Sequence, residues 1–130
     1  MNLYVSDTHA LFWYLTANSK LGPNARAAFL EADQGNAIIY VPSILLAELY
    51  FLNAKYGHPI NFVETYERLA GAAQFRFVSF RAEDVLHFDR LTSIPEMHDR
   101  IIAAAAHALN AACLTRDPMI TNNPQVRSVW

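Results

Sequence analysis

The sequence predicts an α/β fold, a three-layer α/β/α sandwich around a central, mainly parallel sheet of four to five strands. Short apolar runs typical of buried strands alternate along the chain with segments whose apolar residues recur at helical spacing. Such alternation favours a parallel sheet that is covered by helices on both faces. The 130 residues contain no linker, repeat or low-complexity segment, so we expect one domain over residues 1–130.

The predicted strands are short and rich in apolar residues. The first is Asn2–Ser6, and residues 37–41 are a continuous apolar run, typical of a strand that is buried on both faces. Residues 75–80 alternate with a period of two, as in a half-exposed edge strand. Residues 112–115 predict another buried strand, and residues 126–130 are the candidate for a fifth.

Helical spacing marks the segments between these strands. A helix is expected from Thr8, because the run at 10–15 is too apolar for a surface loop. Pro42-Ser43 opens the helix after the second strand, and the breaker sequence Gly57-His58-Pro59 ends it. The other expected helices occupy residues 25–33, 61–70, 82–91 and 98–110.

Composition sets limits on the function classes. No apolar run approaches the roughly 20 residues of a membrane span, and the start does not resemble a signal peptide, so we expect a cytoplasmic protein without membrane association. The net charge is −2, so any nucleic-acid contact must use a local cluster of Arg and Lys. The single Cys113 cannot form an intrachain disulfide and is expected in the core.

Glu48 is the most unusual acid of the chain. It is the only charged residue between Asp33 and Lys55, and it lies in the apolar helical segment at 44–52. A carboxylate that leaves water without a partner costs several kcal/mol or gives up its charge. Glu48 therefore needs a cation, or other acids with which it shares protons.

Three further acids are expected near Glu48. Asp7 directly follows the first strand, Asp99 lies in the first turn of the Ala-rich helix, and Asp117 follows the strand that ends at Thr115. In a parallel α/β sheet, the carboxyl ends of strands and the starts of helices share one edge, where such folds bind ligands. The other eight Asp and Glu residues fall in polar faces or loops.

Each of the four acids also has a structural interpretation. Asp7 and Asp117 could each cap the helix that follows, and Asp99 could complement a helix macrodipole. For Glu48 the alternative is an ion pair with Arg100 or Arg116, or a side chain that reaches water past its apolar neighbours.

Convergence of several carboxylates would have a chemical consequence. Their repulsion either forces protonation or recruits a cation. All-oxygen ligation selects hard cations, and a sparse set of carboxylates leaves positions for water and phosphate oxygens, which suits Mg²⁺ or Mn²⁺ better than Ca²⁺. The chemistry indicated is metal-assisted hydrolysis of a phosphodiester, with one ion or two.

Five sequence pieces, in this order and spacing, resemble one known family. With them the chain resembles the PIN-domain ribonucleases, in particular the VapC toxins of bacterial and archaeal toxin–antitoxin pairs. The pieces are Val5-Ser6-Asp7-Thr8-His9-Ala10-Leu11, Ala47-Glu48, His98-Asp99-Arg100-Ile101-Ile102-Ala103, Leu114-Thr115-Arg116-Asp117 and Val129-Trp130.

The resemblance implies a compact parallel-sheet sandwich and an enzyme that cuts RNA within the chain. It implies a catalytic Mg²⁺ or Mn²⁺ site built from Asp7, Glu48, Asp99 and Asp117. Asp7 and Asp99 would bind the ion directly or through one water, and Glu48 would bind it or orient the attacking water. Asp117 would hold a second, weaker ion, and Thr115 would support the site by hydrogen bonding.

The resemblance also implies partners. VapC-like proteins form homodimers and bind a small cognate antitoxin, whose tail lies across the active-site groove. Arg100 and Arg116 flank the expected ligands and are expected to pair with them. Six further basic residues are candidates for contacts with the RNA backbone, although a solvated surface position is the commoner role. These are Lys20, Arg26, Lys55, Arg68, Arg76 and Arg81.

Two other functions stay open from the sequence. One is a non-catalytic α/β protein-binding module, whose carboxylates are helix caps and ion pairs. The other is a phosphoaspartate-type phosphatase with Asp7 as the nucleophile and Thr115 assisting. The phosphatase pattern wants a second Asp two positions later, where this chain has His9.

Overall fold

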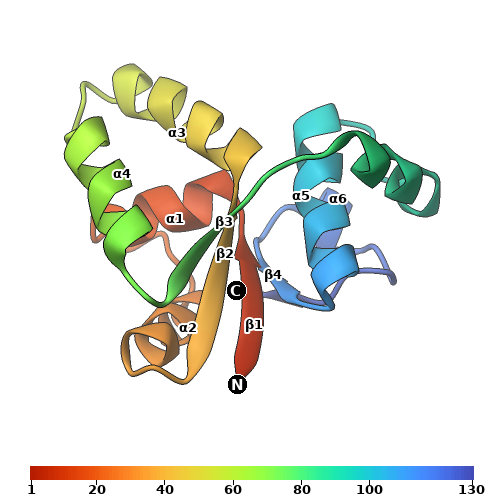
Figure 1. Ribbon diagram of the computed structural model, residues 1–130, viewed down its shortest axis with the longest axis horizontal. Coiled ribbons are helices and arrows are strands. Elements are labelled where there is room, and N and C mark those ends of the chain that lie inside the picture. The colour runs from red at the N-terminus through yellow and green to blue at the C-terminus, as the bar shows by residue number, and fades with distance from the viewer.

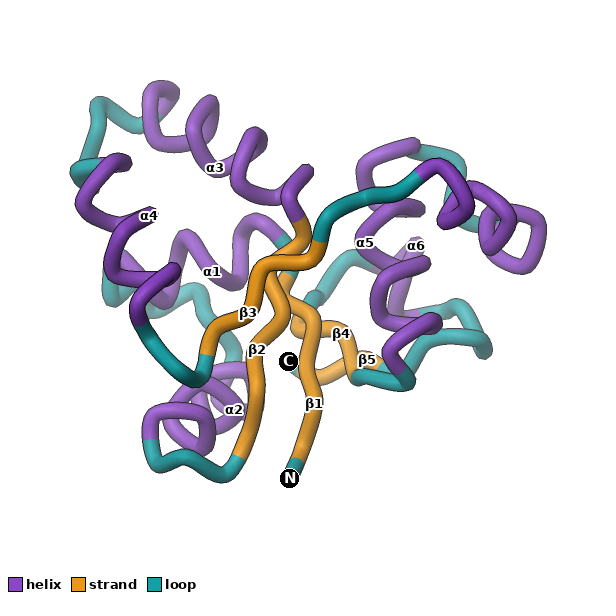
Figure 2. Tube along the Cα trace, in the orientation of Figure 1, coloured by secondary structure: helices purple, strands orange, loops and turns teal.

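The central sheet has five strands, all parallel, in the order β3-β2-β1-β4-β5 (Figures 1 and 2; β5 is labelled in Figure 2). The computed structural model describes all 130 residues. The strands are β1 (Asn2–Ser6), β2 (Ala37–Pro42), β3 (Phe75–Val78), β4 (Ala112–Leu114) and β5 (Ser128–Val129). The predicted fold class, a parallel α/β sandwich with four to five strands, is confirmed.

Helices cover both faces of this sheet (Figures 1 and 2). One layer contains α1 (Thr8–Leu15), α2 (Pro23–Asp33), α3 (Ser43–Lys55) and α4 (Phe62–Gly71). The opposite layer contains the 3₁₀ helix η1 (Ala82–Leu91), α5 (Met97–Leu109) and α6 (Pro118–Thr121). None of these helices is long and apolar enough to cross a membrane.

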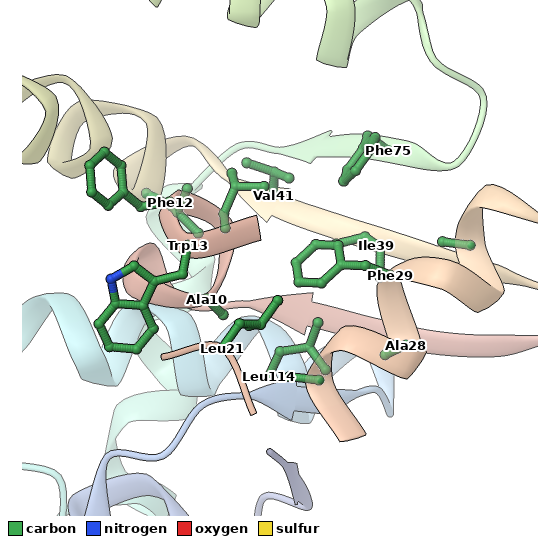
Figure 3. Close-up of a cluster of buried hydrophobic side chains, with 14 of the residues drawn as sticks. Ala10, Phe12, Trp13, Leu21, Ala28, Phe29, Ile39, Val41, Phe75 and Leu114 are labelled. Carbon is green, nitrogen blue, oxygen red and sulfur yellow. The ribbon is translucent and has the colours of Figure 1, made fainter. Parts of the chain in front are cut away.

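Each face of the sheet packs against its own hydrophobic core. The first core has 17 buried residues, mainly from α1, α2, β2 and α3, and Figure 3 shows part of it. The second has 11, mainly from α5 and the segments beside it. Alternation along β1 serves both cores, because Tyr4 packs against the first and Val5 belongs to the second. Cys113 is buried in the second core, as expected.

Three elements differ from the sequence-based expectation. The segment at 82–91 is a 3₁₀ helix and not an α-helix; Leu91 is its only buried residue, so no packed apolar stripe enforces α-helical geometry. Helix α2 begins at Pro23, two residues early, since proline is well tolerated at the first helical position. The last strand contains only Ser128–Val129 of the predicted residues 126–130.

The strand order creates one special position in the sheet. From β1 the chain winds outward to β2 and β3, and then returns to place β4 and β5 on the other side of β1. The winding direction therefore reverses between β1 and β4, at their carboxyl ends. Ligands of open α/β sheets bind at such a switch point.

Candidate active site

A polar cleft of about 940 Å³ opens at this switch point. It is lined by all four acids of the expected site, although they come from four separate segments. These acids are Asp7, Glu48, Asp99 and Asp117. A smaller cavity of about 290 Å³ lies between the end of β3, η1 and α5, and none of the four acids lines it.

Asp7 is held tightly at the end of β1. Its backbone N–H donates to the carbonyl of Leu114 (3.1 Å), which ties it to β4. Its Oδ1 accepts a hydrogen bond from the backbone N–H of Ala10 (2.7 Å), so Asp7 caps α1. Burial raises the pKa of the Asp7 carboxyl, against the hydrogen bonds from the Thr115 hydroxyl and from Ala10 that favour its charged form.

Thr115 joins Asp7 to the segment after β4. The residue is completely buried, and its hydroxyl donates to the Asp7 carboxylate. The same oxygen accepts from the backbone N–H of Asp117 (3.1 Å). One hydroxyl therefore fixes two of the expected site residues relative to each other.

Asp117 caps α6 and lines the cleft together with Asp99. Its Oδ1 accepts from the backbone N–H of Met119 (3.0 Å), and Pro118 occupies the first helical position. The cap expected from the sequence is therefore formed. The pKa of Asp99 nevertheless responds to Asp117 through both charge and a hydrogen bond, so the two carboxyl groups are in close contact.

Asp99 is repelled by three other acids. Burial, then the charge of Asp117 and a hydrogen bond with its side chain, and then the charges of Glu96 and Glu48 raise the pKa of Asp99 to about 7. No basic side chain forms a salt bridge with Asp7, Asp99 or Asp117. These three carboxyl groups are thus not neutralised by an ion pair within the protein.

Glu48 points into the cleft from the second turn of α3. Its Oε1 accepts from the hydroxyl of Thr8 (3.1 Å), and its Oε2 lies 3.8 Å from Nδ1 of His98. The ion pairs with Arg100 and Arg116 that the sequence left open are absent. The side chain is 32% exposed, so its charge is solvated in the cleft and not buried in the apolar helix face.

Glu96 and His98, which lie beside Asp99, were not among the site residues predicted from the sequence. Glu96 caps α5 by accepting from the backbone N–H of Asp99 (2.7 Å), and its Oε1 lies 3.1 Å from Nδ1 of His98. Burial opposes ionisation of Glu96, but backbone hydrogen bonds from Asp99 and His98 and the charge of His98 lower its pKa overall. Glu96 and Asp99 are three residues apart, which is the spacing of a helix cap and the N3 residue that it contacts. This spacing could have predicted the cap from the sequence.

The two arginines do not pair with the acids as expected. Arg100 turns away from the cleft, because its guanidinium donates to the carbonyls of Ile94 (Nε, 2.7 Å) and Thr92 (3.4 Å). Arg116 does line the cleft, but its guanidinium lies over the rings of Trp13 (4.7 Å) and Trp130 (5.7 Å). Aromatic faces therefore hold Arg116 in place of a carboxylate.

The donor set of the cleft fits a hydrated hard cation. No group of three or more His, Cys, Asp or Glu side chains stands close enough to enclose a metal ion by itself. Mg²⁺, however, keeps several waters and is commonly bound by one or two carboxylates together with substrate phosphates. The adjacent, unpaired carboxyls of Asp99 and Asp117, with Asp7 tied to them through Thr115, match that requirement.

The raised pKa of Asp99 predicts a pH-dependent cost to stability. Because the folded state favours the protonated carboxyl, stability is highest below the unfolded pKa near 3.8 and falls as the pH rises toward about 7. Solvent screens part of this repulsion, so we expect about 1 kcal/mol at pH 8. Asp99→Asn should therefore raise the Tm of metal-free protein at pH 8 by about 4 °C.

Scanning calorimetry in EDTA at pH 4 and pH 8 checks this expectation. The Tm difference between Asp99→Asn and wild type should shrink at pH 4, and added Mg²⁺ should stabilise wild type more than the variant. Asp89→Asn, at an exposed position outside the cleft, is the matched control. A wild type as stable as Asp99→Asn at pH 8 would contradict the proposed repulsion.

Comparison with known proteins agrees with the fold. The model of the PIN domain family matches residues 4–124. None of the curated proteins matches the chain. The structure is similar to a chain in the crystal structure of VapBC2 from Rickettsia felis bound to a DNA fragment from their promoter. That similarity has a TM-score of 0.70 at 20% identity, covers 97% of this chain and 96% of that chain, and shows the fold.

The family follows from the extent of the match. The matched residues, 4–124, run from β1 to the segment after α6 and include every acid of the cleft. They make up far more than half of the chain. The protein is therefore a member of the PIN domain family.

Proposed function

We propose that this protein is an endoribonuclease that hydrolyses RNA phosphodiester bonds with Mg²⁺ or Mn²⁺ as its cofactor. The observation that carries the proposal is the meeting of Asp7, Glu48, Asp99 and Asp117 in one cleft, where the Asp99 and Asp117 carboxyls repel each other without a basic partner. Such repulsion is the expected signature of a site made for a cation. PIN domains are nucleases, which supports the same reaction class.

The roles of the residues follow from their placement. Asp7, Asp99 and Asp117 would hold the cation, which when bound lowers the pKa of water and stabilises charge on the phosphate. Glu48, fixed by the Thr8 hydroxyl, would orient the attacking water and accept its proton. Thr115, through its buried hydroxyl, would hold Asp7 and Asp117 in a fixed position relative to each other.

Metal dependence is the first expected result. Purified protein, free of any antitoxin, should cleave single-stranded RNA with Mg²⁺ or Mn²⁺ and should stop when EDTA is added, because the carboxylates alone cannot neutralise a phosphate. Gel analysis of a 5′-labelled RNA measures this. Cleavage that continues in EDTA would exclude the metal mechanism, and a protein without cleavage or an ion-dependent thermal shift would favour the protein-binding module.

The protein-binding alternative has one observation in its favour. Asp7 and Asp117 do cap helices, as that hypothesis requires. Each cap uses Oδ1 and leaves the second carboxylate oxygen outside the cap. Capping also does not explain Asp99, whose carboxyl caps nothing and is repelled by three other acids. For this reason the nuclease is our preferred function.

We further propose that the enzyme is the toxin of a toxin–antitoxin pair and that it acts as a homodimer. The fold shared with a chain of the VapBC2 complex supports this role, as do the sequence pieces that resemble VapC toxins. Induced expression in bacterial cells should arrest growth, and co-expression of a cognate antitoxin should restore it. Growth arrest by Asp7→Asn as strong as that by wild type would contradict a toxic nuclease activity.

A further inference from the structure

The outer end of α3 places exposed aromatic rings on one bank of the cleft. Phe51, which is 72% exposed, and Tyr56, which is 57% exposed, both line the cleft beyond Glu48. One face of the Tyr56 ring is stacked on the buried Phe12 (5.8 Å between centroids, 27° between planes). Tyr56 is therefore fixed against the core on one side, while more than half of the residue stays exposed and its neighbour Lys55 lies 5.7 Å from the ring centroid.

The other bank presents the guanidinium of Arg116, which lies over two indole rings that contact each other edge-on. Arg116 lies over Trp13 and Trp130, whose own ring centroids are 5.7 Å apart. Gly22 makes room for Trp130, since an added Cβ would lie only 2.5 Å from Cδ1 of that ring. This packing fixes the position of the Arg116 charge beside the acids.

Basic side chains gather in this cleft without acidic partners. Lys20 and Lys55 are the only lysines of the chain, and both line the cleft together with Arg116. None of the three forms a salt bridge, although four acids line the same cleft. Instead Lys20 lies over Trp13 (5.9 Å) and Lys55 over Tyr56 (5.7 Å). In a protein with a net charge of −2, this local cluster is available to an anionic ligand.

We propose that these two banks form a subsite for single-stranded RNA, in which bases stack on Phe51 and Tyr56 while Lys55 and Arg116 bind the flanking phosphates. The subsite rests on the proposed nuclease function, because the scissile phosphate would lie at the adjacent acids. Stacking platforms combined with basic groups bind single strands, whose bases are free to leave their neighbours. An RNA duplex keeps its bases stacked and offers mainly its backbone and minor groove.

A protein partner is the competing occupant of this cleft. Exposed aromatic rings serve either class of ligand. Three basic groups without salt bridges, next to carboxyls suited to a cation that would also bind phosphate, match a polyanion better than an ordinary protein surface. The observations therefore favour RNA, and the experiment is designed so that a protein-only role gives a different result.

Binding is measured on the Asp7→Asn background, so that the strand is not consumed. Fluorescence anisotropy with a labelled single-stranded oligoribonucleotide should show about 10- to 30-fold weaker binding for Phe51→Ala, from the loss of base stacking. Lys55→Gln should weaken binding about fivefold and reduce the slope of log K against log salt by about 0.7. Both residues are exposed on α3, so neither change should disturb folding.

Two control variants match these changes outside the cleft. Tyr66→Ala removes an exposed aromatic ring from α4, and Arg90→Gln removes an exposed basic group from η1. Neither should alter RNA binding. A duplex of the same sequence should bind more weakly than the single strand and should be insensitive to Phe51→Ala.

The outcomes separate this subsite from the proposed function. Single-strand binding unchanged by Phe51→Ala and Lys55→Gln would overturn the subsite and assign the rings to a protein partner. Equal affinity for duplex and single strand would also overturn it. Absence of RNA cleavage by the wild type with Mg²⁺ or Mn²⁺ would instead refute the nuclease, while the anisotropy measurement would still decide whether the cleft binds single strands.

Discussion

Asp7→Asn and Asp99→Asn should each lower the rate of RNA cleavage about 1000-fold at saturating Mg²⁺, the scale expected when a group that stabilises transition-state charge is lost. The two acids approach the cleft from different elements, the end of β1 and the first turn of α5. Asparagine keeps the size of the side chain and, at Asp7, keeps an oxygen for the cap on Ala10. The change therefore removes charge with little effect on the fold.

Initial rates on a fluorogenic single-stranded RNA measure this effect, with Asp89→Asn as the control at an exposed position outside the cleft. Both active-site variants should unfold at temperatures equal to or above that of wild type, because each removes a carboxyl whose pKa the fold raises. Loss of activity together with retained stability is the combined signature. If either variant keeps more than a tenth of wild-type activity, the assignment of that acid to the site is wrong.

Thr115→Val should lower activity by 10- to 100-fold, as is typical when a group that orients a metal ligand is removed. Thr115 is completely buried, donates to Asp7 and accepts from the backbone N–H of Asp117. Valine has nearly the same shape, so the core stays filled, but both partners lose their hydrogen bond. The unsatisfied groups should also lower the free energy of unfolding by about 1–3 kcal/mol.

Thr115→Ser is the variant that separates the hydroxyl from packing. It keeps the oxygen and loses one methyl group, at a cost of about 1 kcal/mol. We therefore expect Thr115→Ser to be somewhat less stable than wild type but close to it in activity. A serine variant as inactive as the valine variant would indicate that Thr115 acts through packing alone.

Capping and catalysis are compatible in this cleft because a carboxylate has two oxygens. Asp7 and Asp117 each use Oδ1 for a helix N-terminus, which fixes the direction of the side chain. The cap thus orients the carboxylate and uses only one of its roughly four lone-pair positions. From the sequence alone, the structural and the functional interpretation of an acid at a helix start were alternatives. In this cleft the two interpretations are compatible.

The sequence by itself determined the strand and helix pattern, because hydrophobic period and turn residues are local properties. It also placed the four acids at one edge, since in a parallel sheet that position follows from where each strand ends. The unusual position of Glu48 was also evident from the sequence, because an isolated charge in an apolar helix needs solvent or a partner.

Only the tertiary structure decided which groups meet. The strand order β3-β2-β1-β4-β5 brings Asp117 beside Asp7, and it depends on contacts between residues far apart in the chain. Residues close in sequence have different partners: Arg100 donates to the carbonyl of Ile94, whereas His98 lies beside Glu48 and Glu96. Side-chain partners follow from packing in three dimensions, where hydrogen-bond geometry and desolvation act over a few ångströms, and no sequence period records those distances.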